Sequence, residues 1–205
     1  MVGIVDYGMG NLLSVYHAVD MVGGTPRVCR DPRELSEVER IILPGVGSFG
    51  QCVANLKERG FAEALEDNVL KRGKPFFGIC LGMQVLARRG FEGGDYPGLG
   101  WIDAEVVLLR PSDASLRVPQ IGWNSVSYRK ESPLFKGLPA EPDFYFVHSY
   151  VMRCREEGVT DASCDYGGTI TVAVRKANIF ASQFHPEKSQ EFGLRVLENF
   201  LKWKP

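Results

Sequence analysis

The residues best suited to chemistry form a G-x-C-x-G motif, Gly78-Ile79-Cys80-Leu81-Gly82. The motif lies between an apolar run and a helical pattern, which is the form of a nucleophile elbow with cysteine in place of serine. Glycines two residues to either side allow the strand and helix to approach closely at such a strained turn. We therefore predict that Cys80 is a nucleophile, with the N-terminus of the following helix favouring its thiolate. The alternative is an inert cysteine buried in a core strand.

A thiolate nucleophile needs a base, and the base needs an orienting partner. His185-Pro186-Glu187 supplies both, directly after a strand-like run. Residues i and i+2 at a strand end project to the same side, so Glu187 can meet one ring nitrogen of His185 while the other nitrogen faces Cys80. The remaining histidines, His17 and His148, have no adjacent acid and are predicted to be structural.

The segment from Gly45 to Gly50 satisfies the G-x-G-x-x-G pattern of a dinucleotide site. The acidic residue that such a site requires would be near Glu66, which lies inside a helical pattern, so we reject this interpretation. These glycines instead allow a sharp turn at a strand end. The backbone N–H groups of Val46, Gly47 and Leu81 are then predicted to bind a developing oxyanion. The motifs together describe covalent acyl transfer by Cys80 and His185.

Alternating apolar runs and helical patterns position these motifs in the first 90 residues. Strands are predicted at 2–5, 26–29, 40–43 and 75–79. Helices are predicted from residue 12 to 19, from 51 to 72 with a break at Gly60, and from 81 to 89. This alternation favours an α/β fold whose mostly parallel central sheet is flanked by helices on both faces.

The second half has strand-like runs with little helix between them, at 104–109, 125–128, 144–147, 169–174 and 179–184. We expect these strands to be antiparallel additions to the sheet. Residues 132–142 are expected to form a surface loop. An amphipathic helix follows Ser189, which is its expected N-cap.

Length and charge exclude several classes of protein. The chain has 205 residues, 44% hydrophobic, and a net charge of −1, so we expect one domain, residues 1–205, that binds neither nucleic acid nor membrane. Five cysteines without a C-x-x-C pair should be reduced, as in the cytoplasm. The three histidines and five cysteines show no metal-ligand spacing. We predict no metal and no cofactor.

The succession of a P-G-x-G loop, G-x-C-x-G and H-P-E resembles the class I glutamine amidotransferases over nearly the whole chain. Further motifs resemble one branch, the glutaminase subunits of imidazole glycerol phosphate synthases. These motifs are residues 6–11, 44–49, 122–124, 145–150 and 185–189. The resemblance implies a flavodoxin-like fold and hydrolysis of glutamine to glutamate and ammonia through a thioester on Cys80. The ammonia would pass to a (β/α)₈-barrel cyclase subunit, in a heterodimer that forms imidazole glycerol phosphate and AICAR in histidine biosynthesis.

The resemblance also implies roles for further residues. Gln84 and Glu92 would hold the amino-acid head of glutamine, assisted by the backbone around Ser149 and Tyr150, and a carboxylate suits the ammonium group. The partner interface and ammonia exit would involve Asn11, Trp123, Asn124, Tyr145 and Lys188. Two positions depart from the family pattern, Gln120 where histidine is frequent and Leu13 where a basic residue is frequent. Neither belongs to the predicted triad.

Three other functions are compatible with parts of this pattern. The chain could be a stand-alone γ-glutamyl hydrolase, in which case the isolated chain would turn over its substrate rapidly without a partner. It could be the glutaminase of another biosynthetic complex. It could also be a flavodoxin-like module whose glycine loops hold a phosphate-bearing cofactor, which the absorbance of the purified protein would reveal.

Overall fold

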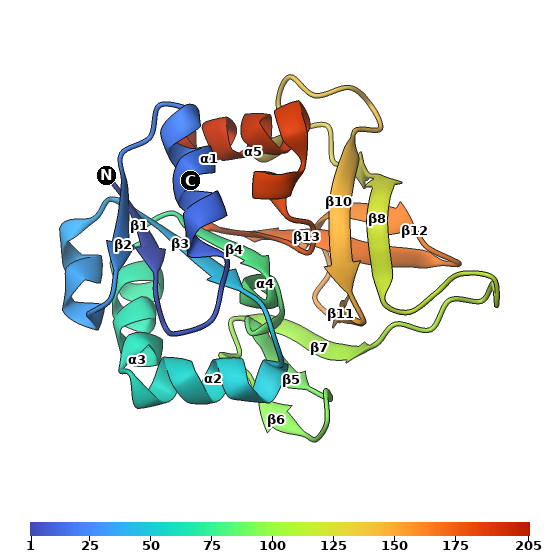
Figure 1. Ribbon diagram of the computed structural model, residues 1–205, viewed down its shortest axis with the longest axis horizontal. Coiled ribbons are helices and arrows are strands. Elements are labelled where there is room, and N and C mark those ends of the chain that lie inside the picture. The colour runs from blue at the N-terminus through green and yellow to red at the C-terminus, as the bar shows by residue number, and fades with distance from the viewer.

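Five parallel strands form the left half of one large sheet in the computed structural model, which describes residues 1–205 (Figure 1). Their order in space is β2-β1-β3-β4-β14. The bounds are β1 (Val2–Val5), β2 (Pro26–Cys29), β3 (Arg40–Gly45), β4 (Phe76–Cys80) and β14 (Ile179–Ser182). Each neighbouring pair in this order is parallel. The α/β class and the first four predicted strands are thereby confirmed.

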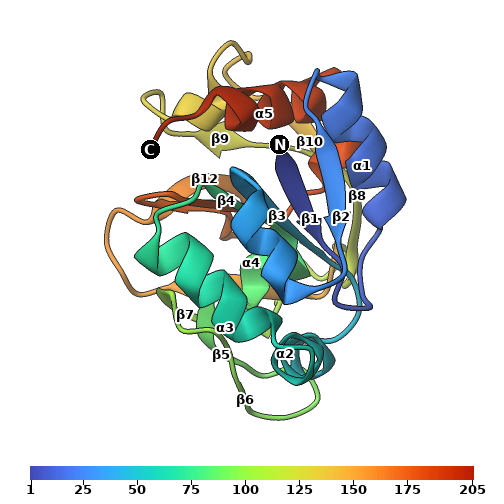
Figure 2. The same ribbon diagram turned by 90° about the vertical axis from the view of Figure 1, so that its left-hand side faces the viewer.

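Helices cover both faces of this parallel region (Figure 2). One face carries α1 (Leu12–Met21) and α5 (Gln190–Lys202), and the other carries α2 (Phe49–Glu58) and α3 (Phe61–Leu65). Side chains alternate between the two cores, since Phe76 packs with the cluster that includes α2 and α3 and Phe77 with the cluster that includes α1 and α5. All of β4 is buried, as expected of a central parallel strand.

The sheet continues beyond β14 with strands from the second half of the chain. Their order is β13 (Thr169–Lys176), β11 (Tyr150–Cys154), β7 (Ile102–Leu108), β5 (Ala87–Gly90) and β6 (Tyr96–Pro97). Strand β12 (Thr160–Asp165) pairs with β13 and with β9 (Ser127–Tyr128). A separate antiparallel pair consists of β8 (Gln120–Ser125) and β10 (Asp143–His148).

Several predictions for the second half need correction. The strand at 179–184 was expected to be antiparallel, but β14 runs parallel to β4 and antiparallel only to β13. The β5–β7 pair is also parallel. The run 125–128 contains the end of β8 and all of β9, and β11 and β12 were not predicted. The loop 132–142 includes a short 3₁₀ turn, Pro133–Phe135, whose leucine and phenylalanine are buried.

The helix predicted for residues 81–89 is wrong beyond its first turn. Helix α4 spans only Leu81–Gln84, and Ala87–Gly90 form strand β5. The backbone groups that would continue the helix bond elsewhere, since the Val85 carbonyl accepts from Leu99 and the Leu86 carbonyl accepts from Ile102. Pairing with distant segments therefore overrides the local helical pattern.

Glycine and serine positions define the remaining helix ends. The break between α2 and α3 is at Gly60, as predicted, and the φ of this residue, +74°, is left-handed. The segment Glu66–Lys71 continues from α3 with wider turns. Ser189 occupies the N-cap position of α5, but its hydroxyl makes no cap bond.

All five cysteines are free thiols. No helix has the length and apolar character needed to cross a membrane.

Candidate active site

Cys80 lies at a strained turn between β4 and α4. Its φ of 54° and ψ of −108° are unusual for a residue with a side chain. The flanking glycines are required by packing. A Cβ on Gly78 would lie 2.5 Å from the Gly82 carbonyl oxygen, and a Cβ on Gly82 would lie 1.9 Å from the Leu43 carbonyl oxygen. This is the geometry of the predicted nucleophile elbow.

The ends of three adjacent parallel strands bring the predicted motifs together. In the register of β3 and β4, Gly45 lies opposite Cys80, and β14 on the other side of β4 leads directly toward His185. Because parallel strands end at the same edge of a sheet, the glycine loop, the thiol and the imidazole meet there.

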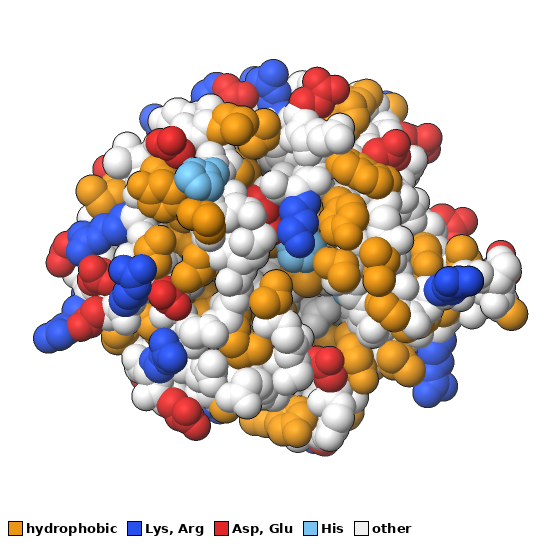
Figure 3. Space-filling view, viewed as in Figure 1, with side chains coloured by type: hydrophobic (Ala, Val, Ile, Leu, Met, Phe, Trp, Pro, Cys, Tyr) orange, Lys and Arg blue, Asp and Glu red, His pale blue; other side chains and the backbone are white.

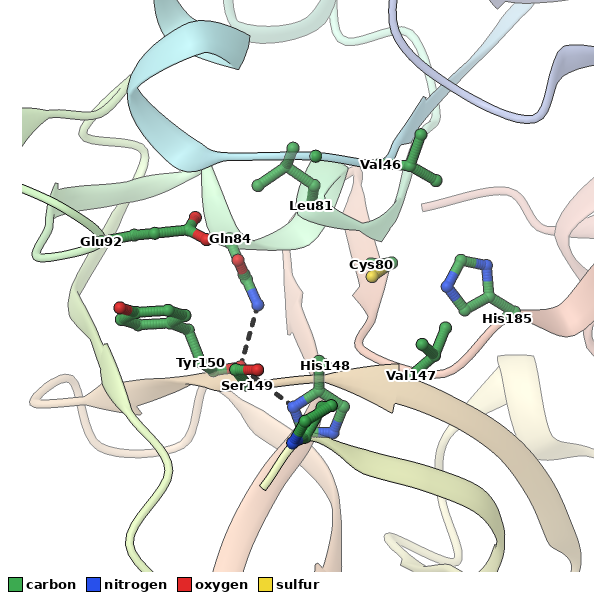
Figure 4. Close-up of a pocket in the computed structure, with 12 residues that line it drawn as sticks. Val46, Cys80, Leu81, Gln84, Glu92, Val147, His148, Ser149, Tyr150 and His185 are labelled. Carbon is green, nitrogen blue, oxygen red and sulfur yellow. Dashed lines mark hydrogen bonds between the residues drawn. The ribbon is translucent and has the colours of Figure 1, made fainter. Parts of the chain in front are cut away.

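A cavity of about 350 Å³ opens at this edge. It is lined by nine of the residues that the sequence predicted: Val46, Gly47, Cys80, Leu81, Gln84, Glu92, Ser149, Tyr150 and His185. Figure 4 shows Gln84 and Glu92 toward one end and the Cys80 sulfur with the His185 ring toward the other. Such a cavity is within the usual size range for a small-molecule site.

His185 is bonded to Glu187 on the side away from the cavity. The two side chains are 2% and 1% exposed, and His185 Nδ1 lies 2.8 Å from Glu187 Oε1. Burial lowers the pKa of His185, but the nearby Cys80 and Glu187 outweigh it and raise the pKa above its ordinary value. The Nε2 atom has no hydrogen-bond partner. His185 is therefore oriented by Glu187 and is able to hold the proton of the thiol.

The loop carrying His185 is held by Ser189. The Ser189 hydroxyl donates to the His185 carbonyl oxygen at 2.6 Å and accepts from the Tyr145 N–H at 3.0 Å. The His185 N–H in turn donates to the Tyr145 carbonyl at 3.0 Å. These bonds explain why Ser189 does not cap α5.

The expected stabilisation of a thiolate by a long helix needs correction. Helix α4 has four residues, so it lacks the aligned peptide dipoles of a full helix. His185 is the basic group at this end of the cavity, and its pKa is raised above its ordinary value by Cys80 and Glu187 against the effect of burial. The predicted contribution of the helix to a thiolate is therefore reduced, and the role of Cys80 as nucleophile stays a prediction.

The other end of the cavity presents oxygen atoms. Glu92 Oε2 accepts a hydrogen bond from the Phe49 N–H at 2.7 Å, which satisfies the N-terminus of α2 where Ser48 makes no side-chain cap bond. Gln84 Nε2 donates to the Tyr150 carbonyl at 2.9 Å. Since its nitrogen is used inside the protein, Gln84 has only its oxygen to offer a ligand at this end.

Three cavity residues were not predicted to belong to the site: Pro119, Val147 and His148. His148 was expected to be structural, and its Nδ1 does bond the Tyr150 carbonyl at 3.0 Å (Figure 4). A carbonyl only accepts, so Nδ1 carries the proton. Burial, with a smaller effect from the charge of His185, lowers the pKa of His148 to about 4, so it is neutral. Its position directly before Ser149 was the available signal.

Comparison with known proteins identifies the family. The family model for class I glutamine amidotransferases matches residues 4–203. The chain belongs to this family. A Campylobacter jejuni protein named imidazole glycerol phosphate synthase subunit HisH 1 is 46% identical over 98% of this chain and all of its own length. A Brucella suis protein named imidazole glycerol phosphate synthase subunit HisH is 44% identical over all of this chain and 99% of its own.

Solved structures agree on the fold of this amidotransferase. A crystal structure described as a glutamine amidotransferase has a TM-score of 0.76 at 24% identity, covering 98% of this chain and 97% of that one. The structure of PurLQS from Thermotoga maritima has a TM-score of 0.77 at 19% identity, with the same coverage. At these identities the likeness concerns the fold alone.

Most of the residues that were predicted to face a partner lie around β8 and β10. Trp123 and Tyr145 are paired across these strands, with ring centroids 6.0 Å apart, and Lys188 Nζ lies 5.8 Å from the Tyr145 centroid. Trp123 is 49% exposed and Ile121 is 63% exposed. Figure 3 shows apolar side chains gathered over this part of the amidotransferase, beside a hollow.

Asn11 and Asn124, the other residues predicted to face a partner, make hydrogen bonds within the chain. The two positions that depart from the family pattern, Gln120 and Leu13, differ from each other in burial. Asn11 caps α1 by accepting from the Ser14 N–H at 3.4 Å. Asn124 is half-buried and donates to the Asp165 carbonyl at 3.0 Å. Gln120 is 2% exposed and lies opposite His148, so the glutamine at this position, where the family frequently has histidine, affects internal packing and not a surface. Leu13, at a position where the family frequently has a basic residue, is 66% exposed on α1.

Proposed function

We propose that this chain is the glutaminase subunit of an imidazole glycerol phosphate synthase, a single domain that hydrolyses glutamine and supplies ammonia to a (β/α)₈ cyclase subunit. The observation that carries the proposal is that Cys80 and His185 line one cavity, with Glu187 bonded to the outer nitrogen of the imidazole. Full-length relatives that bear the synthase subunit name support the choice of complex. Five free thiols support a cytoplasmic location.

Acylation begins with Cys80 as thiolate and His185 as imidazolium. The sulfur attacks the side-chain carbonyl carbon of glutamine, and backbone N–H groups of Leu81 and of the loop at Val46 and Gly47 receive the negative oxygen. The carbon–nitrogen bond then breaks as His185 gives its proton to the departing nitrogen. The products of this step are ammonia and a γ-glutamyl thioester on Cys80.

Deacylation reverses the proton path. A water molecule gives a proton to His185 as its oxygen attacks the thioester carbon. The carbon–sulfur bond breaks, which leaves glutamate and restores the Cys80 thiolate beside imidazolium. Glu187 keeps the same ring nitrogen bonded throughout, so the imidazole stays aligned in both steps.

Substrate orientation follows from the two ends of the cavity. The Glu92 carboxylate and the Gln84 oxygen are suited to an ammonium group, and backbone groups near Ser149 and Tyr150 are suited to a carboxylate. The extended side chain of glutamine then places its carboxamide near Cys80. The nearby face with Trp123, Tyr145 and Lys188 is the proposed side for the cyclase and for the ammonia exit.

Co-purification with the cyclase tests this function. Glutamate release is measured for the free chain, for the complex, and for the complex with the nucleotide ligand of the cyclase. We expect the liganded complex to release glutamate orders of magnitude faster than the free chain. Equal rates would refute the coupling, and a fast free chain would favour a stand-alone hydrolase.

Cys80→Ala separates the two chemistries in the same complex. Removal of the sulfur should abolish glutamine use, while cyclisation supplied with ammonium salt should continue. Glutamine-dependent product from this variant would contradict the assignment of Cys80. Absorbance of the purified wild-type chain, measured first, excludes or reveals a bound coloured cofactor.

A further inference from the structure

Gln183 is a polar side chain that the proposed mechanism does not use, and yet it contacts the nucleophile. It is fully buried between β14 and His185. Its Nε2 lies 3.6 Å from Cys80 Sγ, and its Oε1 lies 2.9 Å from Gln84 Nε2. We propose that Gln183 is a catalytic residue that donates a hydrogen bond to the Cys80 sulfur, and that Gln84 holds it in the donating orientation. This proposal rests on the glutaminase function above.

The direction of each bond follows from one fixed acceptor. The Tyr150 carbonyl can only accept, so Gln84 must present its NH₂ group to it. The same NH₂ group also meets Gln183, which must therefore present its oxygen to Gln84. The amide nitrogen of Gln183 then faces Cys80. Reversal of either amide would leave two donors or two acceptors facing each other.

The sulfur is consequently an acceptor in this arrangement. A thiolate accepts an N–H bond more strongly than a neutral thiol, because charge strengthens a hydrogen bond in a buried site. Gln183 therefore favours the state in which the proton of Cys80 has moved to His185. When a thioester forms, the sulfur loses its charge and this bond weakens, and it strengthens again when the thiolate leaves in deacylation.

The arrangement also joins the two ends of the cavity. Gln84 lines the end proposed for the amino-acid head, whereas Gln183 reaches the reacting sulfur. Gln84 does not touch the sulfur in any bond of the structure, so its effect on Cys80 passes through Gln183. Gln84 is in this respect a positioning residue.

Iodoacetamide provides a test that does not depend on glutamine hydrolysis. The Cys80 sulfur forms a bond to the methylene carbon of the reagent and releases iodide, and peptide mass spectrometry separates this thiol from half-buried Cys154. Gln183→Met removes both the donor and the acceptor at similar length. We expect it to slow alkylation of Cys80 by about tenfold at neutral pH, the effect of losing one hydrogen bond to a charged group.

Ser182→Ala is the matched control. Ser182 is also fully buried on β14, and its hydroxyl bonds the Phe184 carbonyl at 2.9 Å without reaching the sulfur. Its alkylation rate should equal that of the wild type. Gln84→Met should slow the reaction by about threefold, since the Gln183 amide then loses its orienting partner. Circular dichroism and thermal unfolding establish that each variant is folded.

The outcomes decide the proposal separately from the proposed function. An unchanged rate in folded Gln183→Met overturns it. If that variant does not fold, an unchanged alkylation rate in Gln84→Met overturns the proposal instead. The proposal is also overturned if Ser182→Ala slows alkylation as much as Gln84→Met does, because the slowing would then not depend on the Gln183 bond. Glutamate release by the wild-type complex is measured in parallel. Its absence, with alkylation following the expected order, would remove the glutaminase function and leave the Gln183 bond standing.

Discussion

Gly45 lies directly opposite Cys80 in the parallel pairing of β3 and β4. A Cβ on Gly45 would lie 2.8 Å from the Leu81 Cβ and 2.9 Å from the Gly82 N–H nitrogen. The proposed oxyanion loop and the proposed nucleophile are thus set side by side through backbone pairing, with no side chain between them. The distance between these two parts of the site is a property of the sheet.

Gly82→Ala tests how closely the elbow is packed. The added methyl would overlap the Leu43 carbonyl oxygen, 1.9 Å away, and that backbone cannot move without breaking the β3–β4 ladder. We expect the free energy of unfolding to fall by about 4 kcal/mol or more, as measured by urea denaturation. Gly73→Ala is the control, since Gly73 has a positive φ, +71°, but has no atom within 4 Å of the added carbon.

The control should cost only about 1 kcal/mol, the strain of a left-handed alanine. Equal losses for the two variants would mean that the contact with Leu43 does not explain the glycine in the elbow.

Glu187→Gln tests the imidazolium at His185. The pKa of His185 is raised from 6.5 to about 10 in the folded chain, so the folded state binds this proton more tightly than the unfolded state does. The resulting stabilisation is full below pH 6.5 and is lost as pH rises toward about 10. An amide in place of the carboxylate carries no charge, so the variant should lose less stability than the wild type over this interval.

Thermal midpoints of both proteins at pH 6 and pH 10 give the comparison, and subtraction removes the titration of other groups. The same variant should lower kcat for glutamine by about a thousandfold, because the imidazole is no longer oriented as a base. A stability difference that does not vary with pH would contradict the assignment of the charge to this pair.

Glu92→Gln separates substrate recognition from helix capping. An amide oxygen can still accept from the Phe49 N–H, so α2 keeps its cap, but the charge available to an ammonium group is gone. We expect KM for glutamine to rise by about tenfold with little change in kcat. Glu92→Ala should raise KM similarly and also lower the free energy of unfolding by about 1 kcal/mol. A fall in kcat alone would argue against this role.

Trp123→Ala tests the proposed partner face. A half-exposed tryptophan on a sheet is a typical anchor of an interface, so its loss should weaken binding to the cyclase by about thirtyfold in titration calorimetry. Met21→Ala removes another exposed apolar side chain, at the end of α1, and should leave the affinity unchanged. Equal effects would place the interface elsewhere.

The arrangement of the candidate site was the most predictable part of this protein because it depends on local motifs. Gly78 and Gly82 indicated a close approach of backbone, and the structure contains it. His185 and Glu187 do contact each other, as predicted from their spacing of two residues, but the strand-end geometry behind that prediction is wrong. Strand β14 ends at Ser182, and Glu187 lies in the 3₁₀ turn Pro186–Lys188, which curls its carboxylate back to the imidazole. The alternation of strands and helices was similarly visible in the first half.

Features that depend on distant pairing were not predictable. The helical pattern after Gln84 gave no indication that Val85 and Leu86 bond to residues 99 and 102. Nor did the sequence indicate that β14 would lie parallel to β4, although this neighbour is what brings His185 to Cys80. Gln183 was not predicted to belong to the site because its contacts with Gln84 and Cys80 join segments far apart in the sequence. His148 bonds Tyr150, only two residues away, and was missed although it directly precedes Ser149.

The backbone of Tyr145 is joined to that of His185 at one point directly and at a second through the Ser189 hydroxyl. Tyr145 also carries one of the aromatic rings on the outer surface of β10. A partner that binds this ring, as proposed, would therefore contact a strand that is hydrogen-bonded to the backbone of His185, the proposed proton carrier. Only these hydrogen bonds separate the surface ring of Tyr145 from the backbone of His185, and none of them involves the glycine loop at residues 45–47.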